Sequence, residues 1–419
     1  MATTFVSRVH VFSGNVTTTS ASLVQVAQSR TRLDTAHFDG NPVYTLVLNL
    51  RLSAGAQTAT IELQPAGGGP AVLSFTHTGD TSVDRIVSSS FSPTSGANDY
   101  ELWISVSGGA TLAIYSAVLL VAQDETYTKA VVDWSLTRNS GTGMNVSTTP
   151  SELNPSLRFL YEGAKWDSYT AEFHTVGNNG GGGTLTLDLY DGSSAMATNT
   201  HTTNGATLSI DSSVTTLVDG TEYYVRGTAS AGTDVASKAT LRFILTAGFT
   251  KCQVPFFCGG VRADNANDWG NSSTNTNRDC LAHRALIDLS LYDAAKQRAA
   301  YFESIALSAA ASGDTIQLMK VGSTDNGAGS PTSVVSNANT SATKLRTRSS
   351  DILSGFANER YYARNAKGAT AGSADPVAAL VLLEFGPSAS SDVFIQGLSA
   401  IDRGVTMQTA ARLGGVLET

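Results

Sequence analysis

The chain has 419 residues, which is too long for one ordinary domain and predicts two to four. Its composition, 15% charged and 41% hydrophobic with 39 glycines, is not that of a disordered chain, which has more charge and fewer aromatic and β-branched residues. The net charge of −8 argues against a general nucleic-acid binder, because such proteins carry a basic face. The densest basic cluster, KLRTRSS at 344–350, is interpreted as part of a solvated strand or loop.

Three stretches of the chain share one order of predicted elements. Each stretch begins with a strand of alternating apolar and polar residues led by a tyrosine. A turn of small residues follows, and then a strand with a Thr-x-x-Leu core. The tyrosine-to-threonine separations are 16 residues from Tyr44 to Thr60, 17 from Tyr169 to Thr186 and 14 from Tyr301 to Thr315. This spacing predicts a hairpin in each stretch.

A second tyrosine-bearing strand follows in each stretch: NDYELWISVS, GTEYYVRGTA and NERYYARNAK. A loop and a closing apolar strand come next: AIYSAVLLVA, ATLRFILTA and VAALVLLEF. Polar linkers such as SFTHTGDTSVDRIVSSSFSPTSGA are expected between the two halves of each stretch. We predict that Tyr100, Tyr223 and Tyr361 occupy equivalent positions, bury their rings and reach a partner with their hydroxyls.

The repeated order and spacing predict an internal triplication. We therefore expect an all-β chain of three tandem antiparallel β-sandwich, jelly-roll-like domains, with an immunoglobulin-like sandwich as the alternative. The opening strands are SRVHVFSG, KAVVDWSLTRNSG and TKCQVPFFCGG, and the helical-looking run at 291–304 is expected to hold at most a short helix. The predicted boundaries are 1–123, 124–247 and 248–387, with a Cys-bearing loop at 252–280 in the third domain and a C-terminal arm at 388–419.

The C-terminal arm carries apolar side chains such as Phe394, Ile395 and Leu398 with little net charge. Such residues must be covered to remain soluble. We expect a neighbouring subunit to cover them by accepting the arm as an added strand; a sandwich of the same chain is the alternative.

The N-terminus shows no signal peptide, and no apolar stretch approaches the length of a membrane-spanning helix. We therefore expect synthesis in the cytoplasm without a signal peptide, and no membrane partner. Cys252, Cys258 and Cys280 are interpreted as inert thiols of a reducing compartment. A disulfide that pins the 252–280 segment is the alternative, and the sequence leaves the disulfide state open.

No residue set has the spacing of a catalytic, cofactor or metal site, so we expect no enzyme and no cofactor. The histidines are scattered singly, at His10, His37, His77, His174, His201 and His283. The glycine-rich GNNGGGG at 177–183 lacks the Lys-Ser/Thr of a phosphate loop and is predicted to be a flexible hairpin loop. The loop at 262–279 contains Asp264 and Asp268, but Ala266 breaks the ligand order of an EF loop. It is interpreted as a polar surface loop in which Trp269 anchors a neighbour, with calcium binding left open.

A leaderless acidic chain of tandem Ser/Thr/Gly-rich sandwiches resembles structural proteins of tailed-bacteriophage particles: capsid decoration proteins, fibres and tail-associated components. ATTFVSRV, TLVDGTEYYVRGTAS and the repeated strand order carry this resemblance, and no family residues are transferred by it. It implies a non-enzymatic virion protein that assembles with copies of itself and with other virion proteins such as the major capsid or tail proteins, without nucleic acid. The alternative is a carbohydrate-binding protein built of jelly-roll modules, so a glycan partner stays open.

Overall fold

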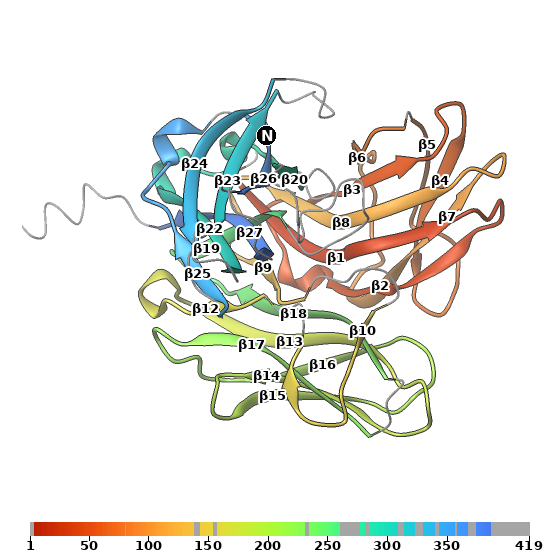
Figure 1. Cartoon of the computed structure of the whole chain (residues 1–419), viewed down its shortest axis with the longest axis horizontal. Coiled ribbons are helices and arrows are strands. Elements are labelled where there is room, and N and C mark those ends of the chain that lie inside the picture. The colour runs from red at the N-terminus through yellow and green to blue at the C-terminus, as the bar shows by residue number, and fades with distance from the viewer. Residues whose placement is uncertain are drawn as a thin grey trace, which may run out of the picture.

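The computed structural model describes residues 4–386 except 80, 138–142, 154–156, 231–233, 260–276, 281–284, 309–313, 323–329, 340–342, 357 and 368–373. The described residues form three β-sandwich domains that follow one another along the chain, red to orange, yellow to green, and teal to blue in Figure 1. Among these residues there is no α-helix, and no helix is long and apolar enough to cross a membrane. The helical elements are short 3-10 turns: η1 (Thr35–His37), η2 (Gly163–Lys165), η4 (Leu289–Leu291), η5 (Ala294–Lys296) and η6 (Leu353–Gly355).

The first domain contains eight strands in two antiparallel sheets. They are β1 (Phe5–Thr18), β2 (Val24–Asp34), β3 (Val43–Leu52), β4 (Thr58–Pro65), β5 (Leu73–Thr78), β6 (Asp84–Val87), β7 (Ala97–Val106) and β8 (Leu112–Gln123). One sheet has the order β1-β8-β3-β6 and the other β2-β7-β4-β5. The first strand therefore pairs with the last, and the chain changes sheet at every step except from β4 to β5, which is the jelly-roll arrangement.

The second domain repeats this order. Its strands are β9 (Ala130–Ser135), β10 (Met144–Asn145), β11 (Ser151–Glu152), β12 (Phe159–Leu160), β13 (Tyr169–Asn178), β14 (Leu185–Tyr190), β15 (Ala195–His201), β16 (Thr207–Val214), β17 (Glu222–Ala229) and β18 (Val235–Leu245). One sheet contains β9-β18-β13-β16, and the other contains β17-β14-β15. The short strands β11 and β12 both pair with β17, in the place that β2 takes in the first domain.

The third domain has the same order again. Its strands are β19 (Cys252–Gly259), β20 (Arg278–Asp279), β21 (Ala285–Ile287), β22 (Gln297–Ser308), β23 (Asp314–Val321), β24 (Thr332–Asn339), β25 (Leu345–Arg348), β26 (Glu359–Lys367) and β27 (Ala374–Phe385). The sheets are β19-β27-β22-β25 and β20-β26-β23-β24, with β21 also paired to β26. The predicted all-β fold of three jelly-roll-like sandwiches is confirmed by this threefold repetition of one strand order.

Two details of the predicted layout are wrong. The tyrosine-led strand and the Thr-x-x-Leu strand do not form a hairpin, because β3 and β4, like their counterparts, belong to opposite sheets and the turn between them crosses the sandwich. The hairpins lie one strand later, at β4–β5, β14–β15 and β23–β24. The supposed linker at 74–97 contains most of β5 and all of β6, whose polar, partly exposed residues hide their strand pattern.

Local patterning explains most of the strands. In β4, Ala59, Ile61 and Leu63 face the core, and the Thr and Glu residues between them face outward. This alternation is expected of a sheet with one solvated face and accounts for the Ser/Thr-rich composition. By contrast, β9 is buried at every position, because Val132 and Trp134 face the core of the second domain and Val131 packs into the core of the first. The run at 291–304 contains the last residue of η4 and the short turn η5 before β22 begins, and thus at most a short helix, as expected.

The three landmark tyrosines are fully buried, which confirms their predicted place in the core. Tyr100, Tyr223 and Tyr361 are each 0% exposed. The Tyr100 hydroxyl accepts a hydrogen bond from the backbone N–H of Thr94 at 2.8 Å. The Tyr223 hydroxyl accepts one from Val218 at 2.7 Å. The Tyr100 and Tyr223 hydroxyls thus tie the segment before their own strand to the core, and all three buried tyrosine rings pack within their sandwiches.

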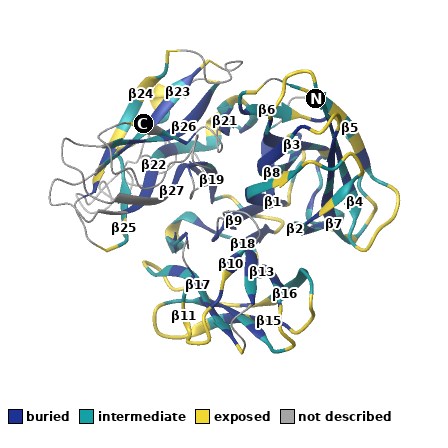
Figure 2. Cartoon of the chain, turned by 45° about the vertical axis from the view of Figure 1, so that its right-hand side comes forward, coloured by how far each residue is buried: buried dark blue, intermediate teal, exposed yellow. Residues whose placement is uncertain are grey.

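The three domains form a closed ring. Figure 2 shows three lobes around a common centre, where the opening strands β1, β9 and β19 lie. β1 and β9 pair in parallel at Arg8 and Val132, which joins the first and second domains into one nine-stranded sheet. One hydrophobic cluster runs through the second and third domains and includes Phe5 and Val6 of the first. The predicted arm at 388–419 lies outside the described residues.

Candidate functional site at the domain interfaces

The two linkers between domains are held by the same clasp. The Asp39 carboxylate accepts hydrogen bonds from the backbone N–H of Thr128 at 2.6 Å and of Lys129 at 3.0 Å, and from the Thr128 hydroxyl at 2.5 Å. Asp167 makes the same three bonds to the threonine and lysine that precede β19, at 2.7, 2.9 and 2.6 Å. Burial opposes ionisation of both carboxyls, but these hydrogen bonds lower the pKa of each. Each linker is thereby tied to the domain that precedes it.

The third domain closes the ring on the N-terminal segment. The backbone N–H of Asp293 donates to the carbonyl oxygen of Thr4 at 2.9 Å, and the Tyr292 hydroxyl donates to the carbonyl oxygen of Val6 at 2.9 Å. Between them, the Phe5 ring lies at the centre of four other rings. Its centroid distances are 5.3 Å to Tyr127, 6.0 Å to Phe249, 5.5 Å to Tyr292 and 5.3 Å to Phe385. Segments of all three domains thus meet at one aromatic cluster.

Sequence reasoning missed this closure, although the sequence carries a signal for it. The pairs Phe38-Asp39, Trp166-Asp167 and Tyr292-Asp293 each follow a 3-10 turn at the same place in their domains. An aromatic residue followed by Asp, shortly before β3, β13 and β22, was open to detection once the copies had been aligned. The role of this pair in contacts between neighbouring domains could not be predicted from the sequence, because it depends on how the three domains are arranged around a common centre.

A buried ion pair forms the interface of the first and second domains. The Asp133 carboxylate on β9 accepts from the Arg242 guanidinium on β18 at 2.7 and 2.8 Å, and both side chains are at most 2% exposed. Asp133 also accepts from the backbone N–H of His10 at 2.7 Å. Arg242 donates to the carbonyl oxygen of Arg32 at 2.7 Å. A charged pair of the second domain is therefore satisfied by backbone groups of the first.

Lys238 is buried at the same interface. Its ammonium nitrogen donates to the carbonyl oxygens of His10 at 3.3 Å and Val11 at 3.2 Å, both on β1 of the first domain. Among the described residues no carboxylate forms an ion pair with it. Burial lowers the pKa of Lys238 to about 7.

The basic cluster at 344–350 forms the interface of the second and third domains. Lys344 contacts Glu152 at 3.0 Å, Arg346 contacts Glu222 at 2.9 Å, and Arg348 contacts Glu162 at 2.5 Å, so all three reach carboxylates of the second domain. Arg346 and Arg348 also hold Glu303 of their own domain, each at 2.6 Å. The interpretation of this cluster as a solvated strand or loop is wrong. Its basic side chains, on and directly before β25, are used in an ion-pair network between domains.

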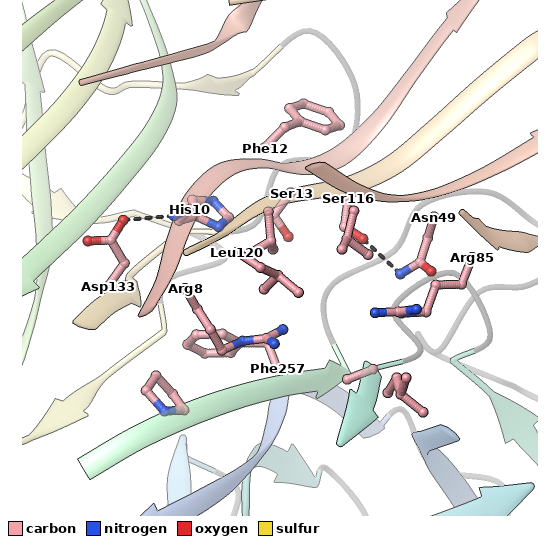
Figure 3. Close-up of a pocket in the computed structure, with 15 residues that line it drawn as sticks. Arg8, His10, Phe12, Ser13, Asn49, Arg85, Ser116, Leu120, Asp133 and Phe257 are labelled. Atoms are coloured by element: carbon pink, nitrogen blue, oxygen red, sulfur yellow. Dashed lines mark hydrogen bonds between the residues drawn. The ribbon is translucent and has the colours of Figure 1, made fainter. Parts of the chain in front are cut away.

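A pocket lies at the interface of the third and first domains. Arg8, Asn49, Arg85 and Ser116 line it from one sheet of the first domain, and Phe257 lies across from them in the third (Figure 3). In Figure 3 the guanidinium groups of Arg8 and Arg85 extend into the same space. The Asn49 amide donates to the Ser116 hydroxyl at 2.8 Å within this lining.

The other residues singled out in the sequence do not converge on a site. Cys252, Cys258 and Cys280 are buried and are not joined in disulfides, and burial raises the pKa of Cys252. The loop residues 262–276, with Asp264, Asp268 and Trp269, lie outside the described residues, as does His283. Within the described part of the chain, no group of three His, Cys, Asp or Glu side chains is placed to hold a metal ion.

Histidines and tryptophans of the second domain are structural. Burial lowers the pKa of His174 and His201 to about 4, so both rings are neutral near neutral pH. His201 lies between the hydroxyls of Thr175 and Thr207, each at 2.9 Å. Trp134 and Trp166 are 2% and 4% exposed and pack in the core. Neither ring therefore offers a face to a sugar.

The glycine-rich loop at 177–183 is not a hairpin loop. It connects β13 to β14, which lie in opposite sheets. The Asn179 side-chain oxygen accepts hydrogen bonds from the backbone N–H groups of Gly181, Gly182 and Gly183 at 3.0 to 3.1 Å. The amides that would hold a phosphate in a phosphate loop are thus bound within the loop itself.

Comparison with known proteins adds little to this geometry. No family model matches the chain, and no curated protein matches it. Among solved structures, the chain is similar to one described as the triple jelly roll fold and turret assembly in an archaeal virus, with 9% sequence identity and a TM-score of 0.16 over 91% of each chain. A superposition this poor carries no argument. The description of the chain as a ring of three jelly rolls rests on its own strand order.

Proposed function

We propose that this chain is a non-enzymatic structural protein of a virus particle that acts through protein–protein assembly. The single observation that carries the proposal is the closed ring: three sandwiches of one topology, fused in one chain and joined by buried contacts at every interface. Jelly rolls host many functions, so the fold alone does not decide this. The described interfaces contain clasped linkers, packed aromatic rings and paired charges, which serve rigidity rather than turnover.

A ring of three like domains suits a symmetric lattice. The three domains share one strand order, so one chain can offer three related contacts to a surface of threefold or sixfold symmetry. Once one contact has formed, the others bind at high effective concentration, and avidity exceeds the affinity of any single contact. The proposed partners are therefore copies of this chain and a repeating virion protein such as a major capsid or tail protein. The proposed location is the virion.

The tailed-bacteriophage type, as a capsid decoration, fibre or tail-associated component, is the finer form of this proposal. It is supported by the acidic, Ser/Thr-rich composition and the tandem sandwiches. The carbohydrate-binding alternative is less well supported, because the repeated tyrosines and two of the tryptophans are buried.

The experiment is quantitative mass spectrometry and cryo-electron microscopy of virus particles purified from the source of this chain. We expect the chain at a copy number that is a simple multiple of the particle symmetry, with density for three lobes around one centre. Purified particles that lack the chain would overturn the proposal. In parallel, the full chain can be tested on a glycan array, where saturable binding would favour the carbohydrate alternative.

A further inference from the structure

The three interfaces of the ring are built from equivalent positions that carry different charges. Phe5, Ala130 and Cys252 occupy the same register, because each pairs with the last residue of the closing strand of its domain: Gln123, Leu245 and Phe385. Three residues further on, the equivalent positions hold Arg8, Asp133 and Pro255. One position on the inner rim of the ring is thus a cation, an anion and an apolar residue in turn.

Two of the interfaces balance their arginines with carboxylates. In the first–second interface, Asp133 binds Arg242. In the second–third interface, Arg346 and Arg348 bind Glu222, Glu162 and Glu303. The third–first interface differs. Among the described residues, no carboxylate forms an ion pair with Arg8 or Arg85.

The positive charge at the third–first interface is concentrated and partly removed from water. Burial lowers the pKa of Arg8, whose guanidinium lies 4.9 Å from the centroid of the Phe256 ring. Burial, and the nearby charges of Arg8 and Arg360, lower the pKa of Arg85 to about 10. Unbalanced like charges in such surroundings repel each other and destabilise the interface. A bound anion would remove this repulsion.

The pocket between these arginines has the size and donors for a small oxyanion. Its cavity volume is about 50 Å³. Since one water needs roughly 10–15 Å³, there is room for about three to five oxygen-sized atoms. The Ser116 hydroxyl, which accepts from Asn49, can donate its own hydrogen into the same space. Asp133 also lines the pocket, but its carboxylate is already bound by Arg242 and by the His10 N–H.

We propose that the third–first interface binds a tetrahedral oxyanion of the phosphate class between Arg8 and Arg85. The guanidinium forks donate charge-assisted hydrogen bonds to its oxygens, and the Ser116 hydroxyl donates a further one. The anion supplies the counter-charge that the other two interfaces draw from glutamate and aspartate side chains. It therefore stabilises the closed ring.

The test is isothermal titration of inorganic phosphate into the full chain in a chloride buffer free of other oxyanions. We expect saturable binding of one phosphate per chain and a matching rise of the melting temperature. Arg85→Gln and, separately, Arg8→Gln should weaken phosphate binding by about tenfold or more, because each removes charged hydrogen bonds. Arg226→Gln is the matched control, since its guanidinium binds Asp188 away from the interface, and it should bind phosphate as wild type does.

The outcomes separate the alternatives. If wild type shows no saturable response at millimolar phosphate, or if Arg85→Gln binds as tightly as wild type, the site does not exist. If acetate binds as tightly as phosphate, the assignment to a tetrahedral anion is wrong. Should Arg8→Gln fail to fold, Arg85→Gln still decides, because Arg85 lies on the short edge strand β6.

Discussion

The buried ammonium of Lys238 makes the stability of the ring depend on pH in a defined direction. Burial lowers the pKa of Lys238 from 10.5 to about 7. The unfolded chain, with the ordinary pKa, therefore binds this proton more tightly than the folded chain. The free energy of unfolding should rise with pH between about 7 and about 10, and Lys238 should add no pH dependence below or above that window.

The size of the effect follows from the difference between the two pKa values. A shift of this size corresponds to about 5 kcal/mol in total at 1.36 kcal/mol per pH unit, of which about 2–3 kcal/mol falls between about pH 7 and about pH 9. We expect Lys238→Met to lack this part of the rise. The measurement is the free energy of urea unfolding of wild type and variant at both pH values, and the difference between the two proteins isolates the lysine from other titrating groups.

A matched control is available in Lys129, an exposed lysine whose ammonium also donates to a backbone carbonyl, that of Ala36, at 3.3 Å. Lys129→Met should keep the pH dependence of wild type. If Lys238→Met shows the same rise between the two pH values as wild type, the buried lysine is charged in the folded protein at both. The reasoning from burial is then refuted.

Three further predictions concern the centre, the ion pairs and the linkers of the ring. Phe5→Ala should lower the free energy of unfolding by about 3–5 kcal/mol, and by clearly more than Phe75→Ala on β5 at the rim of the first domain. If calorimetry finds equal losses for the two variants, Phe5 has no special role at the centre of the three domains. The double substitution Arg346→Gln and Arg348→Gln leaves the buried Glu303 without a cation and should cost about 3–5 kcal/mol in urea unfolding. Arg364→Gln, at a partly exposed pair with Asp279, should cost about 1 kcal/mol or less, and a comparable loss would mean that burial of Glu303 is unimportant. Asp167→Ala removes the hydrogen bonds that hold the second linker, so trypsin should cut after Lys251 sooner than in wild type. Asp191→Ala, which removes a turn cap elsewhere, should leave the rate of this cleavage unchanged. Equal cleavage rates in all three proteins would show that Asp167 does not hold the linker.

Much of the fold was predictable because its signals are local. The landmark tyrosines Tyr100, Tyr223 and Tyr361 recur at similar spacings, and the strands around them alternate with period two. These features depend only on side-chain volume and on which face of a strand points inward. They were enough to predict three sandwiches of one order.

The pairing of the strands was harder to predict. β3 and β4 have the spacing of a hairpin, yet their turn crosses from one sheet to the other, because in a jelly roll the next strand to enter the sheet comes from elsewhere in the chain. The edge strands β5 and β6 resemble linkers in sequence because half-exposed polar residues mask their alternation. Local spacing does not distinguish a hairpin turn from a turn that crosses between sheets, since both are built from the same kinds of turn residues.

The candidate sites depend almost wholly on tertiary structure. The sequence by itself determined three repeats of one sandwich, with an aromatic-Asp pair in each, because periodicity and turn residues act over short distances. Only the tertiary structure decided that Asp133 meets an arginine, that the cluster at 344–350 meets the glutamates of another domain, and that Arg8 and Arg85 share a pocket. These side chains come together because the ring places surfaces far apart in sequence against each other, and the pairing of charges across such surfaces leaves no periodic trace in the chain.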